Sequence, residues 1–244
     1  MLRVGITERG DAGINQLWVR KMPKVEAAIL ITKEVSNEFI ENVLRYKNKV
    51  IVHISITGMG GTKIEPCVPS LNWNYKQVQK LIHSGFPREQ LVLRLDPVVP
   101  TDKGILTAVK VLDKFKDTGI ERCRFSFIDM YKHVQQRFLN TGIKLPFSGF
   151  TAPIEMRSKF LRVLRDYEGI FKFESCGENT EYKRGCISDL DMKILRKDVA
   201  LVGSTQQRKF CLCPTNKIDL LNSKHRCAHQ CLYCYWYDYA PTER

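Results

Sequence analysis

The chain has 244 residues, 43% of them apolar, and its 39 lysines and arginines exceed its 26 acids to give a net charge of +13. That length supports one substantial hydrophobic core, and the apolar content argues against wholesale disorder. No apolar run is long enough to cross a membrane, and the N-terminus lacks the pattern of a secretory signal. We therefore expect a cytoplasmic protein with no membrane partner, in which clustered cysteines serve metal or redox chemistry more often than disulfides.

Six short segments rich in β-branched or aromatic residues predict β-strands. In chain order they span residues 2–7, 27–33, 50–57, 90–96, 123–129 and 170–175. Helical patterns lie between or after them at residues 37–48, 72–84, 104–117, 153–169 and 188–197. Alternation of strands and helices implies parallel strand pairing through crossover helices. The prediction is a single α/β domain over residues 1–244.

Six βα units either curl into a partial or full TIM-like β/α barrel or spread into a doubly wound sheet, and we expect the barrel. Residues 1–170 would supply the βα repeats, and residues 171–244 form a cysteine-rich region. In both architectures functional residues gather at the carboxyl ends of the strands. The candidate pocket residues at these ends are Arg9, Asp11, Arg94, Asp96 and Asp129. A strand would point Arg94 and Asp96 to one face, where opposite charges must be paired or used unless the strand tip is exposed.

The net charge of +13 favours a polyanionic partner such as a nucleic acid. The basic residues are spread along the chain, however, whereas a nucleic-acid interface asks for a basic patch on one face. A merely soluble basic surface explains the composition equally well, so charge alone leaves both interpretations open.

Three cysteines, Cys227, Cys231 and Cys234, have the spacing C-x3-C-x2-C, and Tyr233 precedes the last of them. A structural zinc site needs a fourth ligand. The candidates for that ligand are Cys211, Cys213, His225 and His229. An iron–sulfur cluster also usually takes four cysteines, and with only three from the protein one iron stays open to a substrate or cofactor. The residues themselves leave zinc and iron open.

The C-x3-C-x2-C spacing with an aromatic residue before the last cysteine resembles the signature of the radical S-adenosylmethionine (SAM) superfamily. Its place late in the chain resembles a permuted, spore-photoproduct-lyase-like branch that is often described as a domain of unknown function. The stretches that carry the resemblance are "TERGDAG" at 7–13, "ILITK" at 29–33, "TGMGGTKIEPCVP" at 57–69, "LRLDPVVPT" at 93–101, "FSFIDMY" at 125–131, "QQRKFCLC" at 206–213 and "CAHQCLYCYW" at 227–236.

The resemblance implies that Cys227, Cys231 and Cys234 ligate a 4Fe–4S cluster in a C-terminal loop of the barrel, with Tyr233 beside the cofactors. The fourth iron would bind SAM, and an electron donor such as flavodoxin or ferredoxin would supply the electron that cleaves SAM. The resulting radical would take a hydrogen atom from a nucleic acid or nucleotide, for repair or modification. Modification of a peptide or small molecule, and a non-catalytic zinc-stabilised nucleic-acid-binding module, stay open as alternatives.

The remaining cysteines have less specific interpretations. Four of them equal one full ligand set and are candidates for a second site holding an iron–sulfur cluster or zinc, against the alternative of buried or reactive thiols. These four are Cys176, Cys186, Cys211 and Cys213. By resemblance to spore photoproduct lyases, Cys67 is a candidate catalytic thiol that returns a hydrogen atom to a product radical. Cys123 and His53 lie in predicted strands and are expected in the core, His53 as a hydrogen-bonded structural residue.

Overall fold

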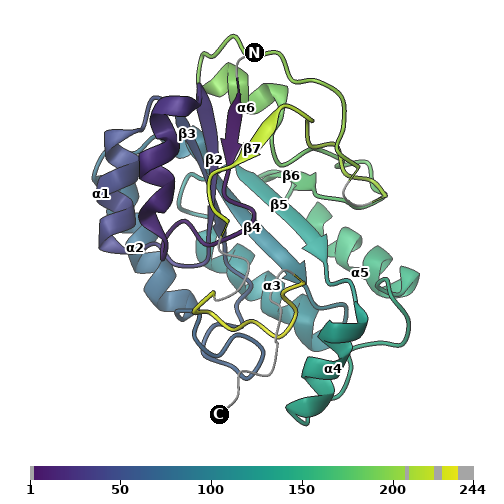
Figure 1. Cartoon of the computed structure of the whole chain (residues 1–244). Helices are drawn as coiled ribbons and strands as arrows, with labels where there is room; N and C mark the ends of the chain where they lie inside the picture. The colour runs from purple at the N-terminus through teal and green to yellow at the C-terminus, as the bar shows by residue number, and fades with distance from the viewer. Residues whose placement is uncertain (1–2, 207–208, 223–226, 236–244) are drawn as a thin grey trace, which may run out of the picture.

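The computed structural model describes residues 3–206, 209–222 and 227–235. It shows a mixed α/β fold around a seven-stranded, all-parallel sheet with the strand order β6-β5-β4-β3-β2-β1-β7 (Figure 1). The strands are β1 (Val4–Ile6), β2 (Ala27–Thr32), β3 (Val50–Ser55), β4 (Leu91–Val98), β5 (Arg122–Phe127), β6 (Lys172–Ser175) and β7 (Lys217–Asp219). The six predicted strands are confirmed, whereas β7 was not predicted.

The strand order is that of a barrel rather than of a doubly wound sheet. Strands β1 to β6 lie side by side in chain order, without the reversal that a doubly wound sheet has. Strand β7 adds to the other side of β1, where the last strand of a barrel would lie. The described residues show no pairing between β6 and β7, so these two strands are the edges of an open sheet.

Within the described residues, six α-helices and two 3₁₀-helices connect the strands. They are α1 (Asn37–Arg45), α2 (Leu71–His83), α3 (Asp102–Phe115), α4 (Lys132–Asn140), α5 (Ile154–Arg165), α6 (Asp189–Ile194), η1 (Gln16–Lys24) and η2 (Arg88–Gln90). Helices α1, α2 and α3 begin after Ser36, Ser70 and Thr101, whose side chains accept a backbone N–H of the first turn. Five predicted helices are confirmed, and α4 is an addition. No described helix is long and apolar enough to span a bilayer.

Alternate residues of each strand serve two different cores, as the strand period requires. Leu30, Val52 and Leu93 face the main core, to which helices α1, α2, α3 and α5 contribute their apolar sides. Ile29, Ile51 and Val92 point to the opposite face, where they pack against α6 and the flanking segments 186–199 and 211–213. We call this opposite side the inner face of the sheet.

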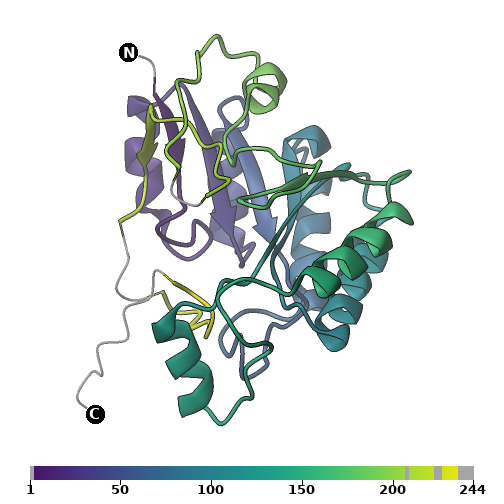
Figure 2. The same ribbon diagram turned by 90° about the vertical axis from the view of Figure 1, so that its right-hand side faces the viewer.

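A third core forms at the carboxyl ends of the strands and brings the C-terminal cysteine motif there. Met59 after β3 and Val99 after β4 pack together with Phe138 of α4. Cys231, Leu232 and Tyr233 belong to the same cluster. The motif segment therefore lies beside α4, although the two are far apart in sequence, as Figure 2 shows.

Candidate functional site

A cavity of about 540 Å³ lies at the carboxyl ends of the strands. Its volume is within the range of small-ligand sites, about 300–1,000 Å³. The cavity collects every predicted site residue except Cys67. Its lining includes Arg9, Asp11, Arg94, Asp96, Asp129, Tyr233 and the cysteines 176, 186, 211, 213, 227, 231 and 234. Residues from both ends of the chain therefore share one site.

The motif loop has no helix or strand of its own and is held by contacts to other segments. Cys234 donates its backbone N–H to the carbonyl of Cys231 (3.1 Å), which closes the last turn. Arg137 of α4 is buried and donates to the carbonyls of Cys231 (3.4 Å) and Cys234 (2.6 Å). Leu232 donates to the carbonyl of Ile64 in the loop after β3 (3.0 Å). No sequence pattern indicated the role of Arg137, because this role depends on where α4 lies.

The motif thiols are the soft donors that iron and zinc sites use. Burial raises the pKa of Cys227 to about 11 and that of Cys231 to about 12. Both thiols are therefore protonated at neutral pH without a metal, and binding a cation would release their protons. In the part of the chain that the structure describes, no three or more His, Cys, Asp or Glu side chains are arranged to hold a metal ion as they stand. His225, an alternative fourth ligand, lies outside the described residues.

Asp11 lines the cavity, but its carboxylate is used to organise the site. One oxygen accepts from the backbone N–H of Gly13 (2.8 Å) and the hydroxyl of Thr32 (2.6 Å). The other accepts from the backbone N–H of Lys33 (2.6 Å) and lies 3.0 Å from Nε2 of His229. Asp11 thus clamps His229, a residue inside the cysteine motif, to the ends of β1 and β2. These bonds give Asp11 a positioning role, and its predicted contact with the cofactor stays a prediction.

Lys33, Glu65 and Tyr233 form a buried polar network beside the motif. Glu65 is 1% exposed and accepts from Thr57 (2.6 Å), Lys33 (3.1 Å) and the Tyr233 hydroxyl. The Lys33 ammonium also lies 5.2 Å from the centre of the Tyr233 ring. Burial alone would lower the pKa of Lys33, but the charge of and hydrogen bond to Glu65, together with the charges of Cys231 and Asp96, outweigh burial and raise that pKa. Lys33 is therefore a fixed positive charge at the cavity wall, and sequence reasoning missed both it and Glu65.

Arg94 and Asp96 do point to one face of β4, as predicted, and they form an ion pair there. Arg94 is 6% exposed, which excludes the alternative of a solvent-exposed strand tip. The Asp96 carboxylate also accepts the hydroxyl of Ser126 from the neighbouring strand β5. Arg9 pairs with Asp219 of β7 at 3.2 Å. The charged residues of the cavity floor are thus held in place by one another.

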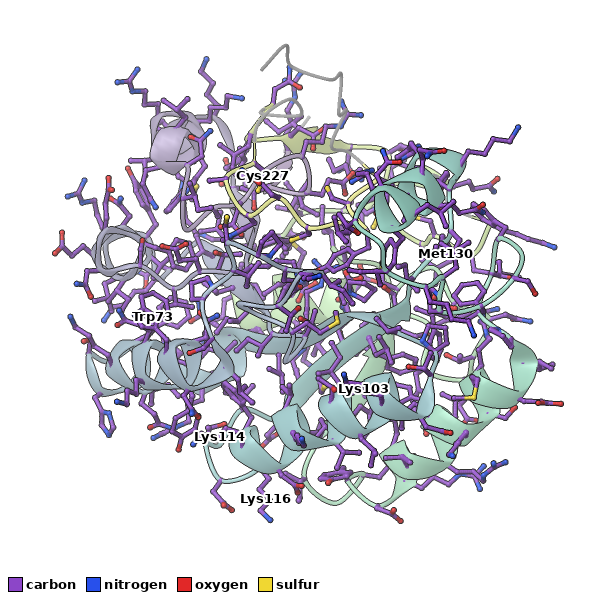
Figure 3. The ribbon with its side chains drawn as sticks, turned by 90° about the horizontal axis from the view of Figure 1, so that it is seen from below. Trp73, Lys103, Lys114, Lys116, Met130 and Cys227 are labelled. Carbon is purple, nitrogen blue, oxygen red and sulfur yellow. The ribbon has the colours of Figure 1, made fainter. Side chains whose placement is uncertain are left out.

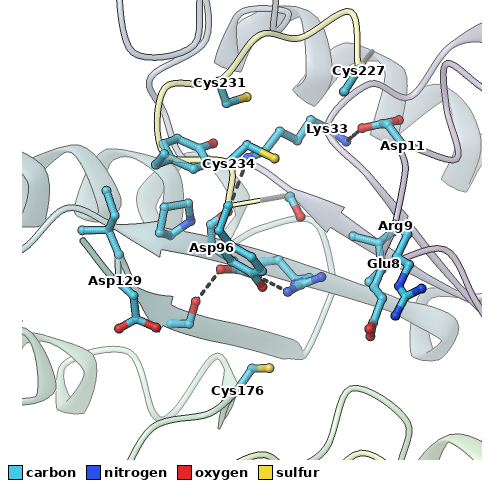
Figure 4. A pocket seen from close by; sticks show the side chains of 18 of the residues that line it. Glu8, Arg9, Asp11, Lys33, Asp96, Asp129, Cys176, Cys227, Cys231 and Cys234 are labelled. Carbon is cyan, nitrogen blue, oxygen red and sulfur yellow. Dashed lines mark hydrogen bonds and ion pairs between the residues drawn. The ribbon is translucent and has the colours of Figure 1, made fainter. Parts of the chain in front are cut away.

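The four other cysteines predicted as a group do come together, on the far side of the cavity. Figure 4 shows Cys176 on one side of Asp96 and Cys227, Cys231 and Cys234 on the other. The sulfurs of Cys176 and Cys186 are 3.2 Å apart.

Three other predicted residues lie elsewhere. Cys67 is exposed and does not line the cavity, although its backbone N–H donates to the carbonyl of His229 (3.4 Å). Its role as a hydrogen-atom donor stays a prediction. Cys123 is fully buried, as expected. His53 is buried too, but neither ring nitrogen has a hydrogen-bond partner among the described residues, so the expected hydrogen-bonded histidine is wrong.

Aromatic side chains surround Tyr131 at the rim of the cavity. The rings of Tyr131 and His133 are stacked with centroids 5.6 Å apart. The Phe150 ring meets Tyr131 edge-on at 4.9 Å, and the Tyr235 ring lies 5.7 Å away. Tyr235 is 44% exposed and Phe150 48%. Partly exposed aromatic faces of this kind can stack on a planar ligand.

Comparison with protein families gives a match that covers most of the chain. A family described as "Domain of unknown function (DUF1848)" matches residues 15–236. The chain belongs to the DUF1848 family. No curated protein matches the sequence. Among solved structures, the catalytic domain of a mannanase from Streptomyces sp. SirexAA-E is similar over 80% of this chain and 83% of its own. The sequence identity is 10% and the TM-score is 0.30, so this likeness is too weak to inform fold or activity.

Proposed function

We propose that this DUF1848 protein is a radical SAM enzyme built on a partial TIM-like barrel, with a nucleic acid or nucleotide as its substrate. Cys227, Cys231 and Cys234 would hold a 4Fe–4S cluster, and SAM would lie beside it in the cavity. The observation that carries the proposal is that these three thiols line one cavity at the carboxyl ends of a sequentially ordered parallel sheet. When bound, the cluster supplies the electron for reductive cleavage of SAM.

The chain's own residues position and shield the proposed cofactors. The clamp from Asp11 to His229 and the two hydrogen bonds from Arg137 fix the loop that carries the thiols. Lys33 places a positive charge near Cys231, which offsets the negative charge of bound thiolates. Apolar contacts around Cys231 and Tyr233 exclude water, and solvent exposure is one of the factors that set a cluster's potential.

A planar, anionic substrate fits the rim and the charge of the molecule. The aromatic group at Tyr131 offers faces on which a nucleobase can stack. The net charge of +13 attracts polyanions, although part of it lies far from the site. Lys114 and Lys116, for example, are at the end of α3 remote from Cys227 (Figure 3). Peptide or small-molecule modification is the alternative, and a cytoplasmic flavodoxin or ferredoxin would be the electron donor.

The test is SAM cleavage by protein reconstituted with iron and sulfide under anaerobic conditions. The wild-type chain should form 5′-deoxyadenosine with dithionite as reductant, and Cys231→Ala should abolish it without unfolding the protein. Cys67→Ala is the matched control, because this cysteine is exposed and lies outside the cavity. SAM cleavage retained by Cys231→Ala would sink the proposal.

The same reaction identifies the substrate class. Deuterium-labelled DNA, RNA and peptides are offered in turn, and label that appears in 5′-deoxyadenosine marks the hydrogen donor. Transfer from DNA or RNA supports the proposed substrate, whereas transfer from a peptide alone would replace it with the alternative.

A further inference from the structure

The four remaining cavity cysteines come from chain segments that lead away from one edge of the sheet and back to the other. Cys176 follows β6 directly, and Cys186 is in the next turn of chain before α6. Cys211 and Cys213 lie shortly before β7. Strands β6 and β7 are the two edges, separated by the five other strands. The four thiols therefore meet across the inner face, between segments that no strand pairing joins.

Contacts between these cysteines are close and mostly buried. Cys176 and Cys186 have their sulfurs 3.2 Å apart, and the backbone N–H of Cys186 donates to the sulfur of Cys213 (3.2 Å). The Cys213 thiol also interacts with the thiols of Cys186 and Cys211. Cys186, Cys211 and Cys213 are 5%, 7% and 2% exposed. The four thiols thus lie near one another and line the same cavity, through which solutes can reach them.

Buried polar groups without partners lie next to the thiols on the inner face. Among the described residues, both ring nitrogens of His53, Nε of Arg94 and Nη1 of Arg124 have no hydrogen-bond partner. His53 and Arg124 are 0% exposed. Cys186 is close enough for its charge to act on all three side chains. Arg94 and Arg124 lie on adjacent strands and already pair with Asp96 and Glu174. Each keeps one buried nitrogen, Nε of Arg94 and Nη1 of Arg124, that has no acceptor among the described residues and can donate to a thiolate.

We propose that Cys176, Cys186, Cys211 and Cys213 bind one thiophilic divalent cation, Zn²⁺ by the nature of the donors, and that this ion joins the two edges of the open sheet. Each thiol that binds gives its proton to solvent, so four thiolates and one divalent ion carry a net charge of −2 beside Arg94 and Arg124. A bound ion stabilises the folded chain, because the unfolded chain does not hold the four sulfurs together.

The sulfur spacing favours an ion over a disulfide. Two ligands of a tetrahedral zinc ion are about 3.8 Å apart, given a Zn–S distance of about 2.3 Å. The 3.2 Å between Cys176 and Cys186 must therefore widen by about 0.6 Å, a small side-chain adjustment. A disulfide would need the same atoms to approach by more than about 1 Å. A four-iron cluster is larger than one ion and would require a wider separation of all four sulfurs.

The test is made independent of the proposed radical chemistry by removing the other three ligands. The full chain carrying C227A/C231A/C234A is expressed with zinc and iron in the medium, and both metals are measured by mass spectrometry. We expect about one zinc per chain. Adding Cys186→Ser or Cys213→Ser should reduce zinc to background, while adding Cys67→Ser should leave it unchanged.

A second measurement covers the case in which these variants fold poorly. Alkylation of each cysteine in the wild-type chain is followed peptide by peptide, with and without a strong zinc chelator. The four thiols should react at least about tenfold faster after chelation, since bound thiolates are poor nucleophiles, and exposed Cys67 should not change. A Cys176–Cys186 disulfide in anaerobically prepared protein, equal reactivity with and without chelator, or about four irons in place of zinc would each overturn the proposal.

Discussion

Replacement of Asp11 by asparagine tests whether the motif loop depends on this one carboxylate. The side chain connects the end of β1, the end of β2 and His229 through four close partners. Asparagine has the same shape, but it offers one acceptor oxygen in place of two. Whichever way the amide is turned, its NH₂ group faces donors that the carboxylate accepts. The substitution therefore removes the charge and two of the hydrogen bonds while it leaves the packing unchanged.

The expected cost is a large part of the stability of a domain. A hydrogen bond to a charged group contributes about 1.5–3 kcal/mol, and breaking a buried charge pair costs about 3–5 kcal/mol. Asp11 is 8% exposed, so little solvent screening reduces these values. Asp11→Asn should lower the free energy of unfolding by about 3–5 kcal/mol. Asp102→Asn is the control, because its exposed ion pair with Lys159 should change stability by less than about 1 kcal/mol.

The free energy of unfolding that Asp11→Asn loses should also depend on pH within a defined range. Burial would raise the pKa of Asp11, but the hydrogen bond and charge attraction with His229 and the hydrogen bonds from Thr32 and Lys33 together outweigh burial and lower that pKa below its ordinary 3.8. Burial would lower the pKa of His229, but Asp11 raises it above 6.5. The Asp11 contribution is present above pH 3.8 and is lost as pH falls through the lower folded value. The His229 contribution is present below pH 6.5 and is lost as pH rises through the higher folded value.

Urea unfolding at several pH values measures both effects. Trp18 is a built-in reporter, because its indole N–H donates to the carbonyl of Ala12 next to Asp11 (3.0 Å) and its ring is fully buried. The difference between wild type and Asp11→Asn should be greatest between about pH 4 and 6.5 and should narrow at higher pH. A difference under about 1 kcal/mol, or one that does not change with pH, would refute the clamp.

Three further predictions concern other parts of the site. Arg137→Ala should lower the free energy of unfolding by about 1.5–3 kcal/mol, because two carbonyls of the motif loop lose their donor. In protein reconstituted with iron and sulfide, the same variant should lose iron to a chelator faster than wild type. An unchanged rate of iron loss would contradict this role. Glu174→Gln should cost about 3–5 kcal/mol in urea unfolding, since the carboxylate is buried against Arg124. Burial would raise the pKa of Glu174, but the neighbouring arginines lower it. The stabilisation by ionised Glu174 is therefore present above pH 4.5 and is lost as pH falls through the lower pKa of the folded state. A loss of stability in Glu174→Gln that does not depend on pH would contradict this prediction. Tyr131→Ala should weaken the binding of a single-stranded oligonucleotide by about 1–3 kcal/mol, measured by fluorescence anisotropy, without changing the salt dependence of binding. Equal affinity of the variant and the wild type would exclude stacking at the rim.

The parts of the fold that the sequence predicted are those with local signals. A few consecutive residues are enough to indicate an apolar strand or a helix with a Ser or Thr N-cap, and these elements were predicted. Strand β7 has three residues of intermediate burial and carries almost no apolar pattern. Helix α4 lacks a side-chain cap and is largely polar, so its pattern resembles a loop. Both elements exist because tertiary packing at the sheet edge and at the motif supports them.

The candidate site likewise contains features that local sequence patterns predicted and others that they did not. The spacing of the three motif cysteines is local, and the rule that polar strand ends converge placed Arg94 and Asp96 in the cavity. The bonds that decide what these residues do are not local. Asp11 and His229 are 218 positions apart, and Glu65 and Tyr233 are 168 apart. No pattern within a short window shows that an aspartate will also hold a histidine that lies far away in the sequence.

The conformation of the motif loop depends on contacts to segments that are remote in sequence. The backbone of the motif accepts from Arg137 and donates to Ile64, and its histidine is bound to Asp11, so the first half of the chain and α4 together fix the loop. A loop with so little structure of its own has one conformation only when the sheet ends and α4 are in place. Its thiols are therefore assembled by folding, within a cavity that is already enclosed by the strand-end loops. Binding of the proposed cluster by the motif and folding of the sheet would then stabilise each other, because each favours the same arrangement of the chain.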